Sequence, residues 1–178
     1  MKKFSRHLLE VAVIVLLILF DRFTKIRAQQ FLRGTDGIEL IKGVLKLYYL
    51  PNGNTGAAFG MFKGQLWLFV FVTVLVCAVL FYILIKLPYV KPYRILHIIL
   101  CCIIAGGIGN LIDRLMNGSV VDFIYFYLIN FPIFNVADCY VTVSTVILAI
   151  LMLFVYREAD FKALEELLVP ERFKKGKK

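Results

Sequence analysis

Residues 131–154 read FPIFNVADCYVTVSTVILAILMLF, and this stretch decides how the chain is built. After Asp138 it is mostly apolar over the length that a helix needs to cross a hydrocarbon core. An unpaired carboxylate is costly at the start of such a helix, because its surroundings offer little water. The stretch therefore predicts a membrane-spanning helix whose first turn carries a charge for a specific purpose.

The composition of the whole chain also indicates a membrane protein. Of its 178 residues, 61% are hydrophobic, whereas a soluble domain usually has about 45–50%. Four stretches are long and apolar enough to be spans, so the predicted fold class is an all-α membrane protein with four transmembrane helices. These stretches are residues 8–28, 66–85, 95–112 and 136–156.

The distribution of basic residues predicts how the chain is oriented. The opening MKKFSRH resembles the start of a secretory signal peptide, but no small-residue cleavage site follows, so we expect it to remain as part of the first span. Lys and Arg also crowd the loop 86–94 and the tail after Tyr156, whereas the loop 115–135 has none. The positive-inside rule then puts both termini in the cytoplasm.

The charge and the cysteines exclude other classes of protein. Basic cytoplasmic ends beside anionic lipid account for the net charge of +9, so no nucleic acid is expected as a partner. All four cysteines lie within predicted spans, and their spacing is not typical of a disulfide framework or a metal site. There is no HExxH, CxxC or P-loop motif. We therefore expect no metal and no cofactor.

The segment between the first two spans has a strand pattern. Residues 29–63 contain IELIKGVLKLYYL, which is rich in β-branched and aromatic residues, followed by the turn formers PNGNTG. This pattern predicts a small antiparallel β-sheet outside the membrane. We expect Phe59, Met61 and Phe62 to dip into the lipid interface.

The C-terminal segment is different from the rest of the chain. Residues 157–178 are predicted to form a basic cytoplasmic tail, separate from a single membrane domain over residues 1–156. Phe161, Leu164 and Leu168 recur at helical spacing among charges. This spacing predicts an amphipathic helix on the membrane surface.

Polar residues gather at one end of the predicted spans. Such residues mark the functional part of a membrane protein. By the topology above they all lie on the outer side, although they come from separate stretches of the chain. They are Asp21, Lys25, Asn52, Asn54, Thr55, Asn110, Asp113, Arg114, Asp122, Asn135 and Asp138.

Most of these residues also have a purely structural explanation. Two structural ion pairs are possible, Asp21 with Lys25 and Asp113 with Arg114. Asn135 is in place to cap the fourth span. The small residues in AGGIG, at 105–109, allow close packing of helices.

Asp122 and Asp138 are harder to explain in this way, because neither has a basic neighbour and both follow apolar residues. Two buried carboxyl groups brought together can share one proton, with one pKa raised and the other left low. Such a pair can activate water with the ionised acid and donate a proton with the other. The start of a helix favours the ionised role for Asp138, but the two acids could exchange roles.

Five motifs in order resemble the bacterial lipoprotein signal peptidase family, signal peptidase II. They are DRFTK at 21–25, NTGAAFG at 54–60, GGIGNLIDR at 106–114, VVDFI at 120–124 and FPIFNVAD at 131–138. The resemblance covers about residues 8–156. It departs from the family pattern at Arg22, Cys139 and Ser144, where Gln, Ser or Ala, and Gly are usual.

The resemblance implies an aspartic endopeptidase of the bacterial cytoplasmic membrane, without a metal or cofactor. It would cut a diacylglyceryl-modified prolipoprotein just before the lipidated cysteine, at a site that faces outward. Asp122 and Asp138 match the catalytic pair. The residues that match polar positions in the family's motifs are Asp21, Lys25, Asn54, Asn110, Asp113, Arg114 and Asn135. An outer β-cradle in that family fits the segment 29–63.

Two other classes of protein fit parts of the pattern. A small proton-coupled transporter would use intramembrane carboxylates as relays, but here the acids gather at one face. A structural scaffold would leave Asp122 and Asp138 unexplained. We expect a monomer that acts on a lipid-modified prolipoprotein and contacts membrane lipids.

Overall fold

The computed structural model describes residues 3–51, 53–56 and 64–168. The predicted interfacial residues Phe59, Met61 and Phe62, and also Asn52, lie outside these ranges. The helices and strands follow one another as α1 (Lys3–Leu32), β1 (Ile38–Ile41), β2 (Leu45–Leu47), α2 (Leu66–Lys86), α3 (Arg94–Asn117), β3 (Ile124–Phe126), α4 (Val136–Ile150) and α5 (Glu158–Leu168).

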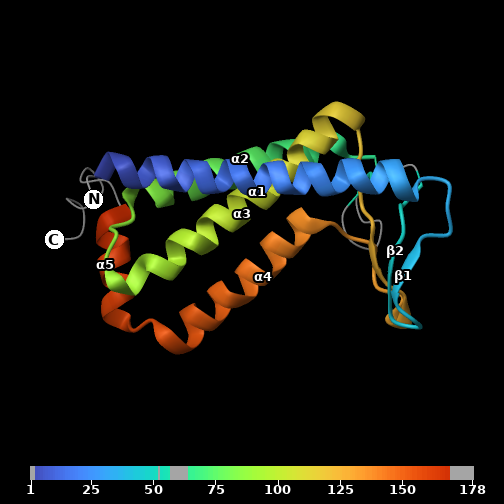
Figure 1. The fold of residues 1–178 in the computed structure, drawn as a ribbon. Coiled ribbons are helices and arrows are strands. Elements are labelled where there is room, and N and C mark those ends of the chain that lie inside the picture. The colour runs from blue at the N-terminus through green and yellow to red at the C-terminus, as the bar shows by residue number, and fades with distance from the viewer. Residues whose placement is uncertain (1–2, 52, 57–63, 169–178) are drawn as a thin grey trace.

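The long helices extend between two different ends of the molecule. Figure 1 shows the strands at one end, and α5 with the start of α1 at the other. Helix α3 is central, because it packs against α1, α2 and α4. Helix α4 continues through a short π-helical segment, Leu151–Val155, before α5 begins. The polar residues identified from the sequence therefore lie near the end that carries the strands.

Three of the described helices are long and apolar enough to cross a membrane, namely Leu66–Lys86, Lys91–Asn117 and Val136–Val155. Their outer surfaces expose large apolar side chains such as Trp67, Phe71 and Phe154, which would be unfavourable in water over so wide an area. The prediction of spans is confirmed for these three. Helix α1 has 30 residues but carries several charges, and it is not one of the three.

The predicted sheet exists, but it has a strand that the sequence did not suggest. Strands β1 and β2 form an antiparallel pair within the segment 29–63, and β3 pairs with β2 from the loop between α3 and α4. Lys46 is opposite Tyr125 in this second pair. The sheet is therefore not confined to the connection between the first two long helices. It joins both connecting segments at this end of the molecule.

Close helix packing accounts for the glycines of α3. A Cβ atom on Gly106 would lie 2.5 Å from the carbonyl oxygen of Ala137, and one on Gly109 would lie 2.7 Å from Oδ2 of Asp21. Both distances are too short for real contacts. The structural explanation of the AGGIG stretch is thus confirmed, because these glycines let α1 and α4 approach α3.

The amphipathic helix predicted in the tail is present as α5. Its Leu164 is buried in the main core, together with Ile14 of α1, Leu84 of α2 and Leu96 of α3. The first part of the segment 157–178 therefore packs against the long helices. The sequence alone predicted only contact with a membrane surface.

Candidate active site

Asp138 lies in the first turn of α4, where Asn135 is the N-cap residue. The backbone N–H of Asp138 donates to Asn135 Oδ1 at 3.0 Å, and the backbone N–H of Asn135 donates to Asp138 Oδ2 at 3.1 Å. This reciprocal arrangement is a capping box, with an aspartate in the position often held by Glu or Gln. It fixes the carboxyl group of Asp138 at the positive end of the helix dipole.

Asp122 lies in an extended segment just before β3 and is 1% exposed. Its backbone carbonyl accepts a hydrogen bond from Leu50 N–H, and the adjacent carbonyl of Phe123 accepts one from Tyr48 N–H. Val121 and Phe123, on either side of it, are buried. Asp122 is therefore held in place by backbone hydrogen bonds from the segment that follows β2 and by the buried side chains before and after it.

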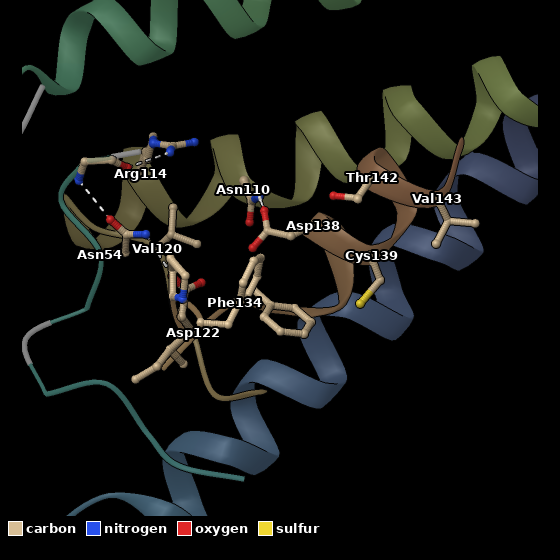
Figure 2. A pocket seen from close by; sticks show the side chains of 14 residues that line it. Asn54, Asn110, Arg114, Val120, Asp122, Phe134, Asp138, Cys139, Thr142 and Val143 are labelled. Carbon is tan, nitrogen blue, oxygen red and sulfur yellow. Dashed lines mark hydrogen bonds between the residues drawn. The ribbon is translucent and has the colours of Figure 1, made fainter. Parts of the chain in front are cut away.

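Asn135 connects the two aspartates. Its Nδ2 donates to Asp122 Oδ1 at 2.7 Å and to Asn110 Oδ1 at 3.1 Å, while Asn110 Nδ2 donates to Asp138 Oδ1 at 2.7 Å. Asn54 Nδ2 donates to the other oxygen of Asp122 at 2.9 Å. Figure 2 shows Asn110 beside Asp138, with Asp122 and Asn54 on the neighbouring wall. Side-chain amides thus hold both carboxyl groups, and no hydrogen bond joins the carboxyl groups to each other.

The surroundings of Asp122 favour its protonated form. Burial, and after it the charge of the nearby Asp138 carboxyl, raise the pKa of the Asp122 carboxyl from 3.8 to about 6. The hydrogen bonds from Asn54 and Asn135 and the charge of Lys25 oppose this shift. A carboxyl group with a pKa of about 6 can hold a proton and release it near neutral pH.

A buried charged cluster lies behind the two aspartates. Lys25 is fully buried, and its Nζ lies 2.8 Å from Asp21 Oδ2 and 2.9 Å from Asp113 Oδ2. Lys25 also donates to Asn110 Oδ1 at 2.9 Å, which links the cluster to the amide that holds Asp138. The predicted pair of Asp21 and Lys25 is confirmed.

The alternative pairing of Asp113 with Arg114 is wrong. Asp113 pairs instead with Lys25 and with Arg22, both from α1. Consecutive residues on a helix point in different directions, about 100° apart, and Asp113 faces α1 while Arg114 does not. Arg22, which the sequence marked only as a departure from a family pattern, is thus part of the cluster. The signal in the sequence was that Arg22 adds another charge at the outer end of the first predicted span, beside Asp21.

Asp21 fixes the start of α4 as well as the cluster. Its Oδ1 accepts a hydrogen bond from the backbone N–H of Ala137 at 2.9 Å. Ala137 precedes Asp138, and its N–H is one of the free donors at the start of a helix. Asp21 therefore ties α1 to the turn that carries Asp138.

A cavity of about 500 Å³ opens beside both aspartates. Its polar wall includes Asn54, Asn110 and Arg114, and its apolar wall comes from residues 131–134 and from α4. The guanidinium group of Arg114 lies 4.8 Å from the centre of the Phe69 ring and donates to Gly56 O at 3.5 Å. A second cavity of about 280 Å³ reaches Asp138 from the side of α2. The side chain of Asp138 thus borders two cavities.

The structure brings all nine predicted site residues to one end of the helices. Asp122, Asp138, Asn54, Asn110 and Arg114 line the larger cavity, and the other four support it from behind. The supporting residues are Asp21, Lys25, Asp113 and Asn135. Among the described residues no group of His, Cys, Asp and Glu is arranged to hold a metal ion. Phe131 and Phe134 of the apolar wall were not predicted.

The chain is similar to known proteins over most of its length. The profile of the family Signal peptidase (SPase) II matches residues 13–154. A lipoprotein signal peptidase of Caldanaerobacter subterraneus subsp. tengcongensis is 41% identical over 145 residues, which are 81% of this chain and 95% of the relative. One from Clostridium novyi is 40% identical over 148 residues, 82% of this chain and 97% of the relative.

Solved structures are similar over much of the chain. One, described as a bacterial membrane enzyme at 2.3 Å resolution, has a TM-score of 0.70 and 29% identity, and the match covers 81% of this chain and 87% of the other. Another, at 1.9 Å resolution, has a TM-score of 0.69 and 28% identity, with 83% and 94% covered. The fold is therefore that of known membrane enzymes.

Proposed function

We propose that this chain, which belongs to the signal peptidase II family, cuts its substrate with the carboxyl groups of Asp122 and Asp138. The chain removes signal peptides from prolipoproteins, as an aspartic-type peptidase. The proposal adds the residues that perform the chemistry. One observation carries it: two carboxyl groups, joined through Asn135, line the same cavity.

The two acids have different environments, which suits them to different roles. Asp138 accepts hydrogen bonds from Asn135 N–H and Asn110 Nδ2 at a helix N-terminus, so it acts as the ionised base. Asp122 is fully buried with a raised pKa, so it carries the proton. This assignment agrees with the role that the sequence favoured for Asp138.

The reaction then follows from proton transfer between these groups. Asp138 takes a proton from a water molecule, and the water oxygen attacks the scissile carbonyl carbon. Asp122 donates its proton to the carbonyl oxygen as the tetrahedral intermediate forms. When the C–N bond breaks, the proton on Asp138 passes to the leaving amine, and the proton on the intermediate's hydroxyl returns to Asp122.

The position of the site suits a substrate anchored in lipid. The cavity lies where α3 and α4 meet the strands, so a bond held near the membrane surface could enter it. We propose that the scissile bond precedes a diacylglyceryl-modified cysteine, and that the apolar walls receive the lipid or the signal peptide. Arg114 and Asn54 are placed to contact substrate carbonyls.

The orientation in the membrane is part of the same proposal. Basic residues in the loop 86–94 and in the tail after Tyr156 favour a cytoplasmic location for that end. The site then faces outward from the bacterial cytoplasmic membrane, with the protease domain in residues 1–156. A reporter enzyme fused in the loop 86–94 should be active only in the cytoplasm, and activity outside would overturn this orientation.

The rival function, a proton-coupled transporter, has less support. A buried Glu10 does lie toward the other end of α1, but the side chains between the two ends include the fully buried and apolar Ile104 and Ala105. A proton relay needs polar groups or water along its path. The described residues therefore favour two separate polar sites over one continuous path.

The test uses the purified full-length protein in detergent with a diacylglyceryl-modified prolipoprotein. Asp122→Asn and Asp138→Asn should each lower the cleavage rate by about 10³-fold or more, because the two residues act as a unit. Asp36→Asn is the matched control, since it removes an exposed carboxylate outside the cavity. Near-normal cleavage by a folded variant of either dyad residue would exclude the proposal.

A further inference from the structure

A further cavity, with charged residues in its wall, lies toward the opposite end of the long helices. It has a volume of about 100 Å³ and lies between α1, Tyr89 in the loop after α2, and the start of α3. Its basic residues are Arg6, Arg94 and His97. Glu10 in this cavity precedes Asp21 by eleven residues on α1, so it is about 16 Å away along the helix axis. The cavity is therefore separate from the site described above.

Three basic side chains lie around the carboxyl group of Glu10. His7 Nδ1 forms a hydrogen bond with Glu10 Oε2 at 2.8 Å, and His97 Nδ1 lies 2.8 Å from Glu10 Oε1. Arg6 Nε lies 3.8 Å from the same oxygen, Oε1. The guanidinium group of Arg6 already balances the single negative charge of a carboxylate at this position. The remaining basic residue of the cavity is Arg94.

Arg94 gives the cavity an excess of positive charge. No described acidic residue forms an ion pair with it; instead its guanidinium group lies 5.6 Å from the centre of the Tyr89 ring. The guanidinium group of Arg6 lies 5.2 Å from the centre of the same ring. One aromatic ring thus positions two guanidinium groups from different helices.

Two further features point to an anion. His97 is 3% exposed, and its Nε2 has no hydrogen-bond partner. Helix α3 begins at Arg94 with no acidic residue in its first turn and no side-chain cap, so its positive end is not neutralised. A buried imidazole nitrogen without a partner, a helix N-terminus and two guanidinium groups therefore meet at one small cavity.

We propose that this cavity binds the phosphate group of an anionic phospholipid in the leaflet at this end of the helices. Guanidinium groups bind phosphate through paired hydrogen bonds, and basic pockets between membrane helices are suited to lipid headgroups. Leu9 and Ile98 line the cavity and expose most of their apolar surface, so acyl chains can lie against them. The proposal does not depend on the role of the two aspartates.

The test measures lipid binding by the full-length protein in detergent, using native mass spectrometry. Phosphatidylglycerol, phosphatidylcholine and inorganic phosphate are added in separate titrations. The variants are Arg94→Gln and Arg6→Gln, which remove one charge each from different helices. Lys162→Gln is the control, because Lys162 is an exposed cation of α5, at the same end of the molecule.

The wild type should bind phosphatidylglycerol more tightly than phosphatidylcholine, and each arginine variant should lose about fivefold in affinity for it. Lys162→Gln should bind like the wild type, and Arg94→Gln should still cleave prolipoprotein. Equal binding of both lipids, or full binding by whichever arginine variant folds, would overturn the proposal. Displacement of the lipid by millimolar inorganic phosphate would show a site for free anions and would also overturn it.

Discussion

Asn135 and Asp138 cap each other across the first turn of α4, each accepting a hydrogen bond from the backbone of the other. The same Asn135 donates from its side chain to Asp122. A residue that stabilises a helix end thus also sets the relation between the two acids. Substitutions at Asn135 can separate these two contributions.

Asn135→Ser should keep the N-cap hydrogen bond to Asp138 and lose the side-chain hydrogen bond to Asp122. A serine hydroxyl accepts the N-cap hydrogen bond, so the free energy of unfolding should change by only a few tenths of a kcal/mol, whereas Asn135→Ala should cost about 1 kcal/mol. Both variants should cleave about 100-fold more slowly, because the amide that orients Asp122 is missing. Thermal unfolding and cleavage rates of the two variants check this. A serine variant with wild-type activity would show that the amide bridge is not needed.

The pH dependence should report the protonation of Asp122. Its pKa is raised from 3.8 to about 6, so the folded protein holds this proton more tightly than the unfolded chain. As the pH rises from about 4 to about 6 the unfolded chain loses the proton first, and the free energy of unfolding falls by up to about 3 kcal/mol. Melting temperatures of the wild type and Asp122→Asn across this range test it, since the variant should lack this part of the decrease.

The same group should shape the activity profile. If Asp122 donates its proton during cleavage, kcat/KM should fall as the pH rises above about 6, because the free enzyme then loses that proton. Steady-state rates between pH 5 and pH 9 on a lipid-modified peptide measure this. A rate that instead increases across the interval would contradict the role of Asp122 as the acid.

Lys25→Met should be strongly destabilising. It leaves Asp21 and Asp113 buried without their shared cation, and breaking a buried pair costs about 3–5 kcal/mol. Lys162→Met removes an exposed ion pair with Glu158 and should change stability by less than about 1 kcal/mol. Denaturant unfolding in detergent compares the two. Equal stability of the two variants would contradict the structural importance of the buried cluster.

Gly106→Ala should disturb the site more than Gly107→Ala. The new methyl group at 106 would meet the Ala137 carbonyl oxygen, which is backbone and cannot move without α4, so a cost of about 1–3 kcal/mol is expected. At 107 it would meet only the side chain of Cys77, at 3.0 Å. Melting temperatures and cleavage rates should both fall further for the variant at 106, and the reverse order would contradict the packing described.

Particular residues show how far local sequence was informative. Asp122 and Asp138 could be predicted because carboxylates among apolar neighbours need a reason, and because the motifs around them resemble one family. The pairing of Asp113 could not, since Arg114 is adjacent in sequence whereas Lys25 and Arg22 are contributed by another helix. Strand β3 was missed for a similar reason, because its partner β2 lies far away along the chain.

The sequence by itself determined that the chain is a membrane protein, that its polar residues lie at one end, and that two aspartates are the candidates for chemistry. These follow from composition, spacing and motif, which are local properties. Only the tertiary structure decided which groups touch. It placed Asn135 between the acids, buried Lys25 between two aspartates of different helices, and assembled the basic cavity around Arg6 and Arg94. Such contacts depend on how helices pack, because side chains distant in sequence meet only where close approach allows it.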